Sequence, residues 1–455
     1  MKHKVLLFFV SFALVPTVCS YAQINCASTT QTKLICEFPV SSTQSNFTLF
    51  GPAANNAANS VASTINASTA TQLTQLPIPS ASIGVVSLRQ KGQEATAPFD
   101  NLGPILTDRP DTVGKGHIYL GFSYQHFGFN AVDGVGLGAL PVSFVTSVLL
   151  TSTDQRTEYG TETNNVNFKL DQEVGIATAG LTKSTDVSIV MPFNSVALHV
   201  TTSNIQAFTF DSAAPNNNNQ PTYQNTVPLG SVAPIYSNGT ANGVGDITLI
   251  LKQQVLGGEG SRTAVAAGAS ARFPTGDSLN LLGSGAFGGN VFGLFEYRAR
   301  VAPHLKLSYQ WNNKSQLVNL SAPPSRLPGG LQFATGADVK ILRTLGASFD
   351  LLGSQFVNTP SFALNTSTIC QTQPSTTTTV PCYQPPSATN GGTGISSSFT
   401  AVSTFNSTYT VVNFSAGLKW TPIRHFLVYA NMTKQVNNVG LRSNIVPLVG
   451  IAFKR

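Results

Sequence analysis

Residues 165–180 read NVNFKLDQEVGIATAG, and this stretch carries the pattern on which the fold depends. Apolar side chains stand at Val166, Phe168 and Leu170, with polar or charged residues between them. Successive side chains of a β-strand point to opposite faces, so the alternation predicts a strand with one apolar and one polar face. No helical stripe of apolar residues competes with this pattern.

Similar alternation recurs along the chain in about twelve segments. They are expected at 116–129, 165–180, 186–209, 246–256, 263–273, 289–299, 305–313, 331–341, 346–356, 409–421, 426–434 and 443–453. Most are longer than the roughly 5–6 residues that are usual in soluble sheets, and they suit tilted strands that cross a membrane. In the third segment the alternation shifts near Pro192, which predicts a β-bulge there.

The connections between these segments alternate between long and short. Residues 301–304 and 422–425 predict tight turns, whereas residues 357–408 form a long excursion rich in Ser, Thr and Pro. Short turns at one end and longer loops at the other are typical of outer-membrane barrels. An even number of strands then leaves both ends of the barrel chain in the periplasm.

The composition excludes two other classes of protein. Only 10% of the 455 residues are charged, against roughly 25% in ordinary soluble domains, which argues against a water-soluble enzyme with a charged coat. No apolar run reaches the roughly 18 residues that a membrane helix needs. Every backbone polar group must be paired within lipid, so strands that cross a membrane must close on themselves. We therefore expect an all-β, transmembrane, antiparallel up-and-down β-barrel of about 12 strands.

The N-terminal region predicts export. Lys2 and Lys4, an apolar stretch and the small residues before Gln23 are typical of a cleaved signal peptide at 1–22. Residues 23–107 read as a low-complexity periplasmic extension, with too little apolar content around 55–74 to bury. Residues 108–455 then form the barrel, and the predicted location is the bacterial outer membrane.

Four cysteines remain after the signal peptide, and they form two local pairs. Disulfides Cys26–Cys36 and Cys370–Cys382 would suit an oxidising compartment. Metal binding is the competing interpretation, but no histidine or second cysteine stands at zinc-ligand spacing. We expect the disulfides, no metal site and no cofactor.

Charged residues that alternate with apolar ones are expected to face a wet lumen, where their mixed signs predict weak charge selectivity. These lumen candidates are Lys169, Asp171, Glu173, Glu296, Arg298, Lys306, Asp338, Lys340 and Lys419. Trp311 and Trp420, near strand ends, are expected in the aromatic girdles at the membrane interfaces.

Residues 107–116 come immediately before the first strand, at the expected periplasmic rim. They contain the charged residues Asp108, Arg109 and Asp111. One hypothesis is that this segment folds into or across the barrel mouth and restricts the bore. The alternative is a solvated turn that leads into the strand.

Several motifs resemble a known family when they are taken in order. They are LGPILTDRPDTVGKG at 102–116, FSYQHF at 122–127, GVGDI at 243–247, RFPTGD at 272–277, LLGSGA at 281–286 and YQWN at 309–312. Over about residues 102–455 the chain resembles the bacterial outer-membrane barrels catalogued as phenol-degradation (MetA-pathway) transporters. The resemblance implies a barrel that passes small, often apolar or aromatic, compounds, and it brings no set of substrate-binding residues.

The expected function is a passive channel or transporter for small molecules, without catalytic residues. The expected partners are outer-membrane lipid, the small-molecule solute and the barrel-assembly machinery, which reads an aromatic C-terminal strand resembling the one that ends near Phe453. The basic charges are scattered, so nucleic acid is not an expected partner. Two alternatives stay open: a non-conducting surface barrel with binding or adhesive loops, and a barrel-embedded hydrolase that uses His126 or His199.

Overall fold

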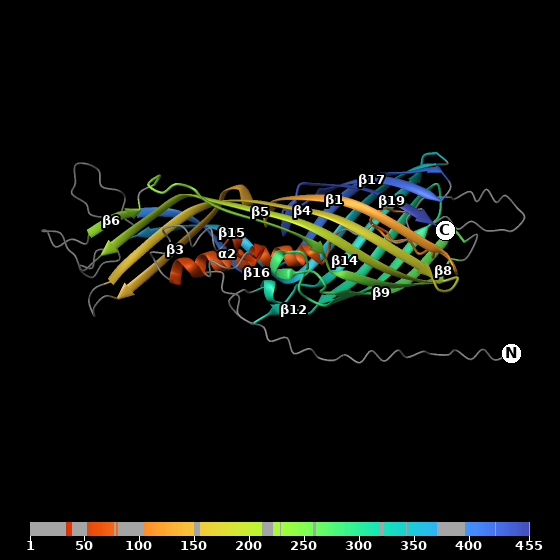
Figure 1. Cartoon of the computed structure of the whole chain (residues 1–455), viewed down its shortest axis with the longest axis horizontal. Helices are drawn as coiled ribbons and strands as arrows, with labels where there is room; N and C mark the ends of the chain where they lie inside the picture. The colour runs from red at the N-terminus through yellow and green to blue at the C-terminus, as the bar shows by residue number, and fades with distance from the viewer. Residues whose placement is uncertain are drawn as a thin grey trace, which may run out of the picture.

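The chain folds into a closed antiparallel β-barrel of 12 strands (Figure 1), which confirms the predicted fold class. The computed structural model describes residues 33–38, 52–76, 79–80, 104–149, 155–211, 222–227, 229–257, 261–318, 323–342, 344–370, 396–423 and 425–454. The predicted signal peptide at 1–22 lies outside these residues, so it stays a prediction.

The barrel strands lie close to the twelve predicted segments and follow one another around the wall. They are β1 (Ile118–Val132), β4 (Gln155–Gly180), β5 (Thr185–Asp211), β8 (Ile247–Leu256), β9 (Thr263–Phe273), β10 (Gly288–Tyr297), β11 (Val301–Asn312), β14 (Gly330–Lys340), β15 (Leu345–Cys370), β16 (Ser396–Ile423), β17 (Phe426–Gln435) and β19 (Ile445–Lys454). Strand β19 pairs with β1, from Tyr119↔Lys454 to Gln125↔Leu448, and this pairing closes the barrel.

Further strands and helices belong to the connections and to the interior. The strands are β2 (Val135–Gly136), β3 (Leu140–Leu149), β6 (Thr222–Val227), β7 (Ile235–Val244), β12 (Lys314–Ser315), β13 (Ser325–Arg326) and β18 (Leu441–Ser443). The helices are η1 (Leu34–Cys36), α2 (Pro52–Leu73), η3 (Leu137–Ala139), η4 (Ser278–Asn280) and η5 (Gln316–Val318).

Short turns join the strands at the end of the barrel where β1 begins, and longer connections join them at the other end, as predicted. The turn expected at 422–425 falls between β16 and β17, with His425 at a φ of 73°. The turn expected at 301–304 is wrong. Residues 301–304 pair with 336–339 of β14, so the turn occupies residues 298–300 instead.

Four strands extend far beyond the rest of the wall (Figure 1): β4, β5, β15 and β16 have 26 to 28 residues each. At a rise of roughly 3.3 Å per residue each is about 85–92 Å long, whereas a membrane strand needs only about 9–11 residues. The excursion expected at 357–408 is therefore partly wrong, because β15 and β16 stay paired from Thr359↔Ser407 to Cys370↔Ser396. Thr and other β-branched residues favour strands even in polar sequence.

The bulge predicted at Pro192 is also wrong. The register between β4 and β5 is continuous at Val174↔Pro192. Proline has no N–H to donate. The break lies instead on the facing side, where Gly245 and Asp246 separate β7 from β8. Both β7 and β8 pair with β5, and the Gly245 N–H donates to the Pro192 carbonyl at 2.8 Å.

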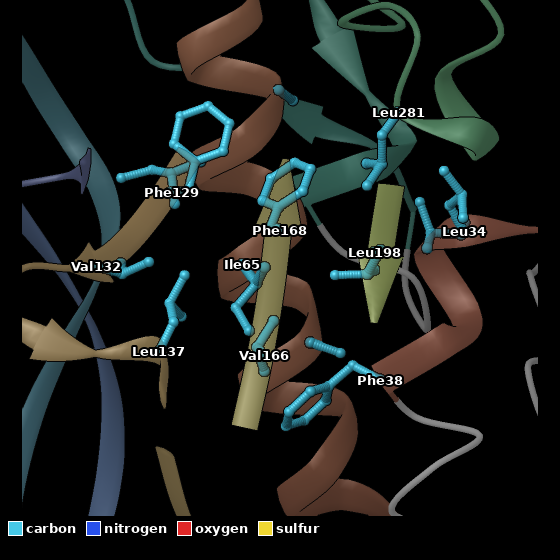
Figure 2. Packing of buried hydrophobic residues seen from close by; sticks show 14 of the residues in the cluster. Leu34, Phe38, Ile65, Phe129, Val132, Leu137, Val166, Phe168, Leu198 and Leu281 are labelled. Atoms are coloured by element: carbon cyan, nitrogen blue, oxygen red, sulfur yellow. The ribbon is translucent and has the colours of Figure 1, made fainter. Parts of the chain in front are cut away.

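Helix α2 lies inside the barrel (Figure 1), so the expectation that this stretch cannot be buried is wrong. Its residues Val61, Ala62 and Ile65 pack with η1 and with wall residues of β1, β4 and β5. Figure 2 shows Phe168 and Val166 of the wall beside Ile65. The wall supplies most of the large apolar side chains of this cluster, so a helix of mainly small residues can be buried against it.

Several side-chain hydroxyls of α2 are satisfied within the helix. The hydroxyl groups of Thr69 and Thr71 donate to the carbonyls of Ile65 and Ala67, four residues earlier, at 2.8 and 2.7 Å. Hydroxyls bonded in this way require no water or wall partner, so they can be buried at little cost. Residues 52–73 are thus a slender helix suited to a confined space.

Candidate functional site: the barrel interior

The outward face of the barrel carries a belt of exposed large apolar side chains. The belt includes Leu120, Phe122, Ile189, Met191, Leu249, Leu251, Val291, Phe295, Leu305, Leu307, Phe414, Leu418, Val449 and Ile451. Trp311 and Trp420 are also exposed on it, toward opposite ends of the strands. Soluble proteins rarely expose a continuous apolar surface of this extent, and acyl chains of a bilayer are its natural solvent.

Six of the predicted lumen residues lie on the inward face of the wall. They are Glu296, Arg298, Lys306, Asp338, Lys340 and Lys419, which share the face that alternates with the exposed apolar belt. The structure does not gather them into one site. Glu296 and Arg298 bind the segment at the barrel mouth, Asp338 and Lys419 pair with each other, and Lys306 lines a cavity.

The other three candidates, Lys169, Asp171 and Glu173, lie on the outward face, which corrects the prediction. Strand β4 buries Phe168, Leu170 and Val174 and leaves the charged residues that alternate with this face outside. The alternation separates the two faces of a strand without saying which one is inside. At this height the interior is filled by α2, so the apolar face turns inward.

Residues 104–116 include the predicted rim segment 107–116, and we call them the mouth segment. They lie inside the barrel beside strands that the short turns connect. Arg109 is buried and binds Glu296 through two nitrogens, Nε to Oε2 at 3.2 Å and Nη2 to Oε1 at 3.0 Å. Arg109 Nη2 also lies 3.0 Å from Oδ2 of Asp111, whose other carboxylate oxygen contacts Arg298. Two arginines thus alternate with two acids across the mouth.

Three further wall residues hold the same segment. Lys252 Nζ donates to the carbonyls of Arg109 and Asp111, at 2.9 and 2.8 Å, and lies 3.5 Å from Asp108. Asp350 accepts a bond from Thr107, and Asp186 accepts one from the Val113 N–H. None of the three was predicted as a site residue, although each is a charged residue within a predicted strand.

A second buried network lies on the inward face of the wall, next to Thr107 of the mouth segment. Asp338 accepts a 2.5 Å bond from Lys419 and lies 3.4 Å from His304, which in turn contacts Asp350 at 2.6 Å. Asp350 also accepts the bond from Thr107, so this network joins the mouth segment to four strands. His304 was expected in a turn, and the shift of that turn to 298–300 places it on the inward face of β11.

Apolar contacts also hold the mouth segment against the wall. Ile105, Leu106 and Val113 pack in one cluster with residues of β1, β4, β5, β17 and β19. The segment is therefore a packed insert in the barrel and not a solvated turn.

A cavity of about 290 Å³ lies between the C-terminal end of α2 and the mouth segment. The N-terminal region contributes residues 72–76 and 79–80 together with Leu106 and Asp108. The wall contributes amide side chains, the aromatic rings of Phe127, Phe129 and Phe292, and the charged groups of Asp246, Arg272, Lys306 and Arg442. We call this cavity the chamber.

The predicted disulfides fall partly on residues that the structure does not describe. Cys36 is disulfide-bonded, but Cys26 and Cys382 lie outside the described residues, so both pairings stay predictions.

The two histidines considered for catalysis contact other side chains. His126 contacts Asp171 and His199 contacts Asn238. Neither histidine hydrogen-bonds a serine hydroxyl within the described part of the chain. The described residues contain no group of three or more metal-ligating side chains, and none of their helices is long and apolar enough to span a membrane.

No family model matches the chain, and no curated protein matches it. Among solved structures, an outer membrane channel from Pseudomonas putida F1 is similar, with 10% identity, a TM-score of 0.41, and coverage of 76% of this chain and 98% of the other. The NanC porin shows 10% identity, a TM-score of 0.29, and coverage of 57% and 93%. A Pseudomonas aeruginosa FadL homologue shows 8% identity, a TM-score of 0.27, and coverage of 74% and 88%.

Proposed function

We propose that the protein is an outer-membrane channel for small molecules with a substantial apolar or aromatic part. The observation that carries this proposal is the chamber, which is enclosed by a barrel with an apolar outer belt and lined by both aromatic and amide side chains. A lining of this kind can replace the hydration of a polar group while it shelters an apolar one. The resemblance to phenol-degradation (MetA-pathway) transporters fits the same class of solute.

The N-terminal region restricts passage in this proposal. Barrels of eight strands are filled by their own side chains, and 16-stranded porins leave an open channel, so 12 strands leave room that a segment of the chain can fill. Here α2 occupies one part of the interior and residues 104–116 occupy the mouth. Solutes then pass by selective diffusion once part of this insert moves.

Conductance of the purified mature chain in a planar bilayer tests the proposal. We expect small single-channel steps, and a much larger step after deletion of residues 23–107, because the deletion removes α2 and the start of the mouth segment. Heat-modifiable migration on gels verifies that the shortened barrel is folded. A folded deletion variant with unchanged conductance would exclude the N-terminal insert as the restriction.

Liposome swelling tests the class of solute. We expect phenol-sized solutes to enter liposomes that contain the protein faster than they enter empty liposomes. The absence of both conductance and swelling would support the second candidate, a non-conducting surface protein. The projecting strands β4, β5, β15 and β16 favour that candidate, because they present a large sheet beyond the belt.

A further inference from the structure

The charged groups that line the chamber do not cancel. Three cations, Arg272, Lys306 and Arg442, share it with two carboxylates, Asp108 and Asp246. Both carboxylates already have partners. Asp246 accepts bonds from the Ser284 N–H and hydroxyl at 2.8 and 2.5 Å, and its Oδ2 lies 3.6 Å from Arg272.

The Asp108 carboxylate already accepts hydrogen bonds from the N-terminal region. It accepts bonds from the Ser80 hydroxyl at 2.8 Å and from the backbone N–H of Arg109 at 2.9 Å, and Lys252 lies 3.5 Å away. These contacts hold the segment around Asp108 in place. Its ion pair is with Lys252, and its charge acts on Lys306 through space, without an ion pair or a hydrogen bond between the two.

Lys306 is the cation most available to a ligand. Its Nζ lies 5.2 Å from the centroid of the Phe292 ring, and no hydrogen bond or ion pair joins it to another described residue. Arg442 donates through Nη2 to the Val412 carbonyl and to Asn413 Oδ1, while its buried Nε has no acceptor in the described part of the chain. Among the described residues, neither cation forms an ion pair or a hydrogen bond with a carboxylate.

Burial of a cation without an anion costs free energy, because the charge loses its hydration. An incoming carboxylate would offset that cost. The same lysine lies over an aromatic ring, beside apolar wall residues such as Ile250 and Leu352. The cation and the apolar wall together complement a molecule with one negative end and an apolar body. The chamber volume, at the lower limit of typical ligand pockets, restricts that body to a small ring or a short chain.

We propose that the chamber binds small organic carboxylates, aromatic or short aliphatic, with the carboxylate at Lys306 and the apolar body against Phe292. This inference rests on the proposed function, since it names the solute class that the channel takes. It also contrasts with the sequence-based expectation of weak charge selectivity, because the mixed charges of the mouth pair with one another while the chamber keeps free positive charge.

Isothermal titration of the purified full mature chain in detergent tests the inference, with benzoate and its neutral isostere benzamide as probes. We expect benzoate to bind at least tenfold more tightly than benzamide. Lys306→Gln should remove this preference, and Lys306→Arg should largely retain it. Lys434→Gln is the matched control, because Lys434 is exposed on the outward face of β17 and should leave both affinities unchanged.

The outcomes separate this inference from the proposed function. A conducting channel that binds benzoate and benzamide equally would overturn the carboxylate site and leave the channel standing. Tighter benzoate binding that depends on Lys306, in a protein that does not conduct, would support the site and overturn the channel. Heat-modifiable migration of each variant shows that the barrel is folded, and a folded Lys306→Gln variant with unchanged benzoate affinity would contradict the assignment of Lys306.

Discussion

The insert inside this barrel has two parts that are held by different physics. Helix α2 and η1 are held by apolar packing in one cluster with residues of the barrel wall, whereas the mouth segment is held largely by ion pairs and charge-assisted hydrogen bonds. Apolar packing is non-directional and grows with the area buried. Buried ion pairs stabilise only while every partner is in place.

The two parts of the insert are therefore expected to differ in mobility. The helix is expected to stay in place, because many apolar contacts together hold its position. The mouth segment is closer to a latch, because loss of Arg109 leaves Glu296, which is only 1% exposed, without its bidentate partner. Movement that admits solute is therefore expected first at the mouth.

The largest effect is expected from Ile65→Asp, which breaks the apolar half of the comparison. This change removes a buried aliphatic side chain and places a carboxyl among apolar neighbours, a loss of roughly 5 kcal/mol in packing of the helix. We expect amide hydrogen exchange across α2 to accelerate strongly and single-channel conductance to rise. Ile65→Val is the control, and equal protection in the two variants would show that apolar packing does not hold the helix.

A smaller and more local effect is expected from Arg109→Gln, which breaks the ionic half. Loss of one partner from a buried ion pair costs about 3–5 kcal/mol, and here it leaves Glu296 uncompensated. We expect more frequent opening events in planar bilayers, with exchange in α2 unchanged. Adding Glu296→Gln should recover part of the closed state, and a double variant that is no better than the single one would contradict the ion-pair latch.

The smallest effect concerns the contact that ties η1 to the loop before β10. Lys33 Nζ lies 3.1 Å from Asp277 Oδ2, and the two side chains are 37% and 42% exposed, so the pair is worth less than about 1 kcal/mol. Partial burial of Asp277 disfavours its charge, but hydrogen bonds from Lys33, Asn280 and the Leu279 N–H outweigh this and lower the pKa of its carboxyl.

A lowered pKa in the folded state means that the contact stabilises η1 at neutral pH. The stabilisation is present above the ordinary carboxyl value of 3.8 and is lost as the pH falls through the lower folded value. We expect proteolysis near Lys33 to increase in acid, and Asp277→Asn to abolish that increase. An identical pH profile in the Asn variant would exclude this pair as the cause.

Much of the wall could be predicted because its pattern is local. The alternation at Leu305, Leu307 and Tyr309 identifies both the strand and its outward face, and β11 bears this out. The same reasoning identified β4 but reversed its faces, because there the apolar side contacts α2 instead of lipid. Turn positions were less reliable, since Pro303 in β11 resembles a turn residue and yet pairs with Ala337.

The candidate site was less predictable than the wall. Asp108, Arg109 and Asp111 were singled out, but their wall partners Lys252 and Asp186 come from strands far away in the sequence. Charge alone could not reveal that Lys306 forms no ion pair with a carboxylate among the described residues, while Asp108 and Asp246 have other partners. That distinction depends on which side chains the closed barrel brings together.

By itself, the sequence determined that the chain forms about twelve long antiparallel strands with two unlike faces, because strand periodicity and backbone pairing are written in neighbouring residues. Only the tertiary structure decided what fills the barrel, which face of β4 turns inward and which cations meet around the chamber. Those features arise from contacts between segments that lie hundreds of residues apart, and a slender helix of Ala, Ser and Thr acquires an apolar environment only once the wall has closed around it.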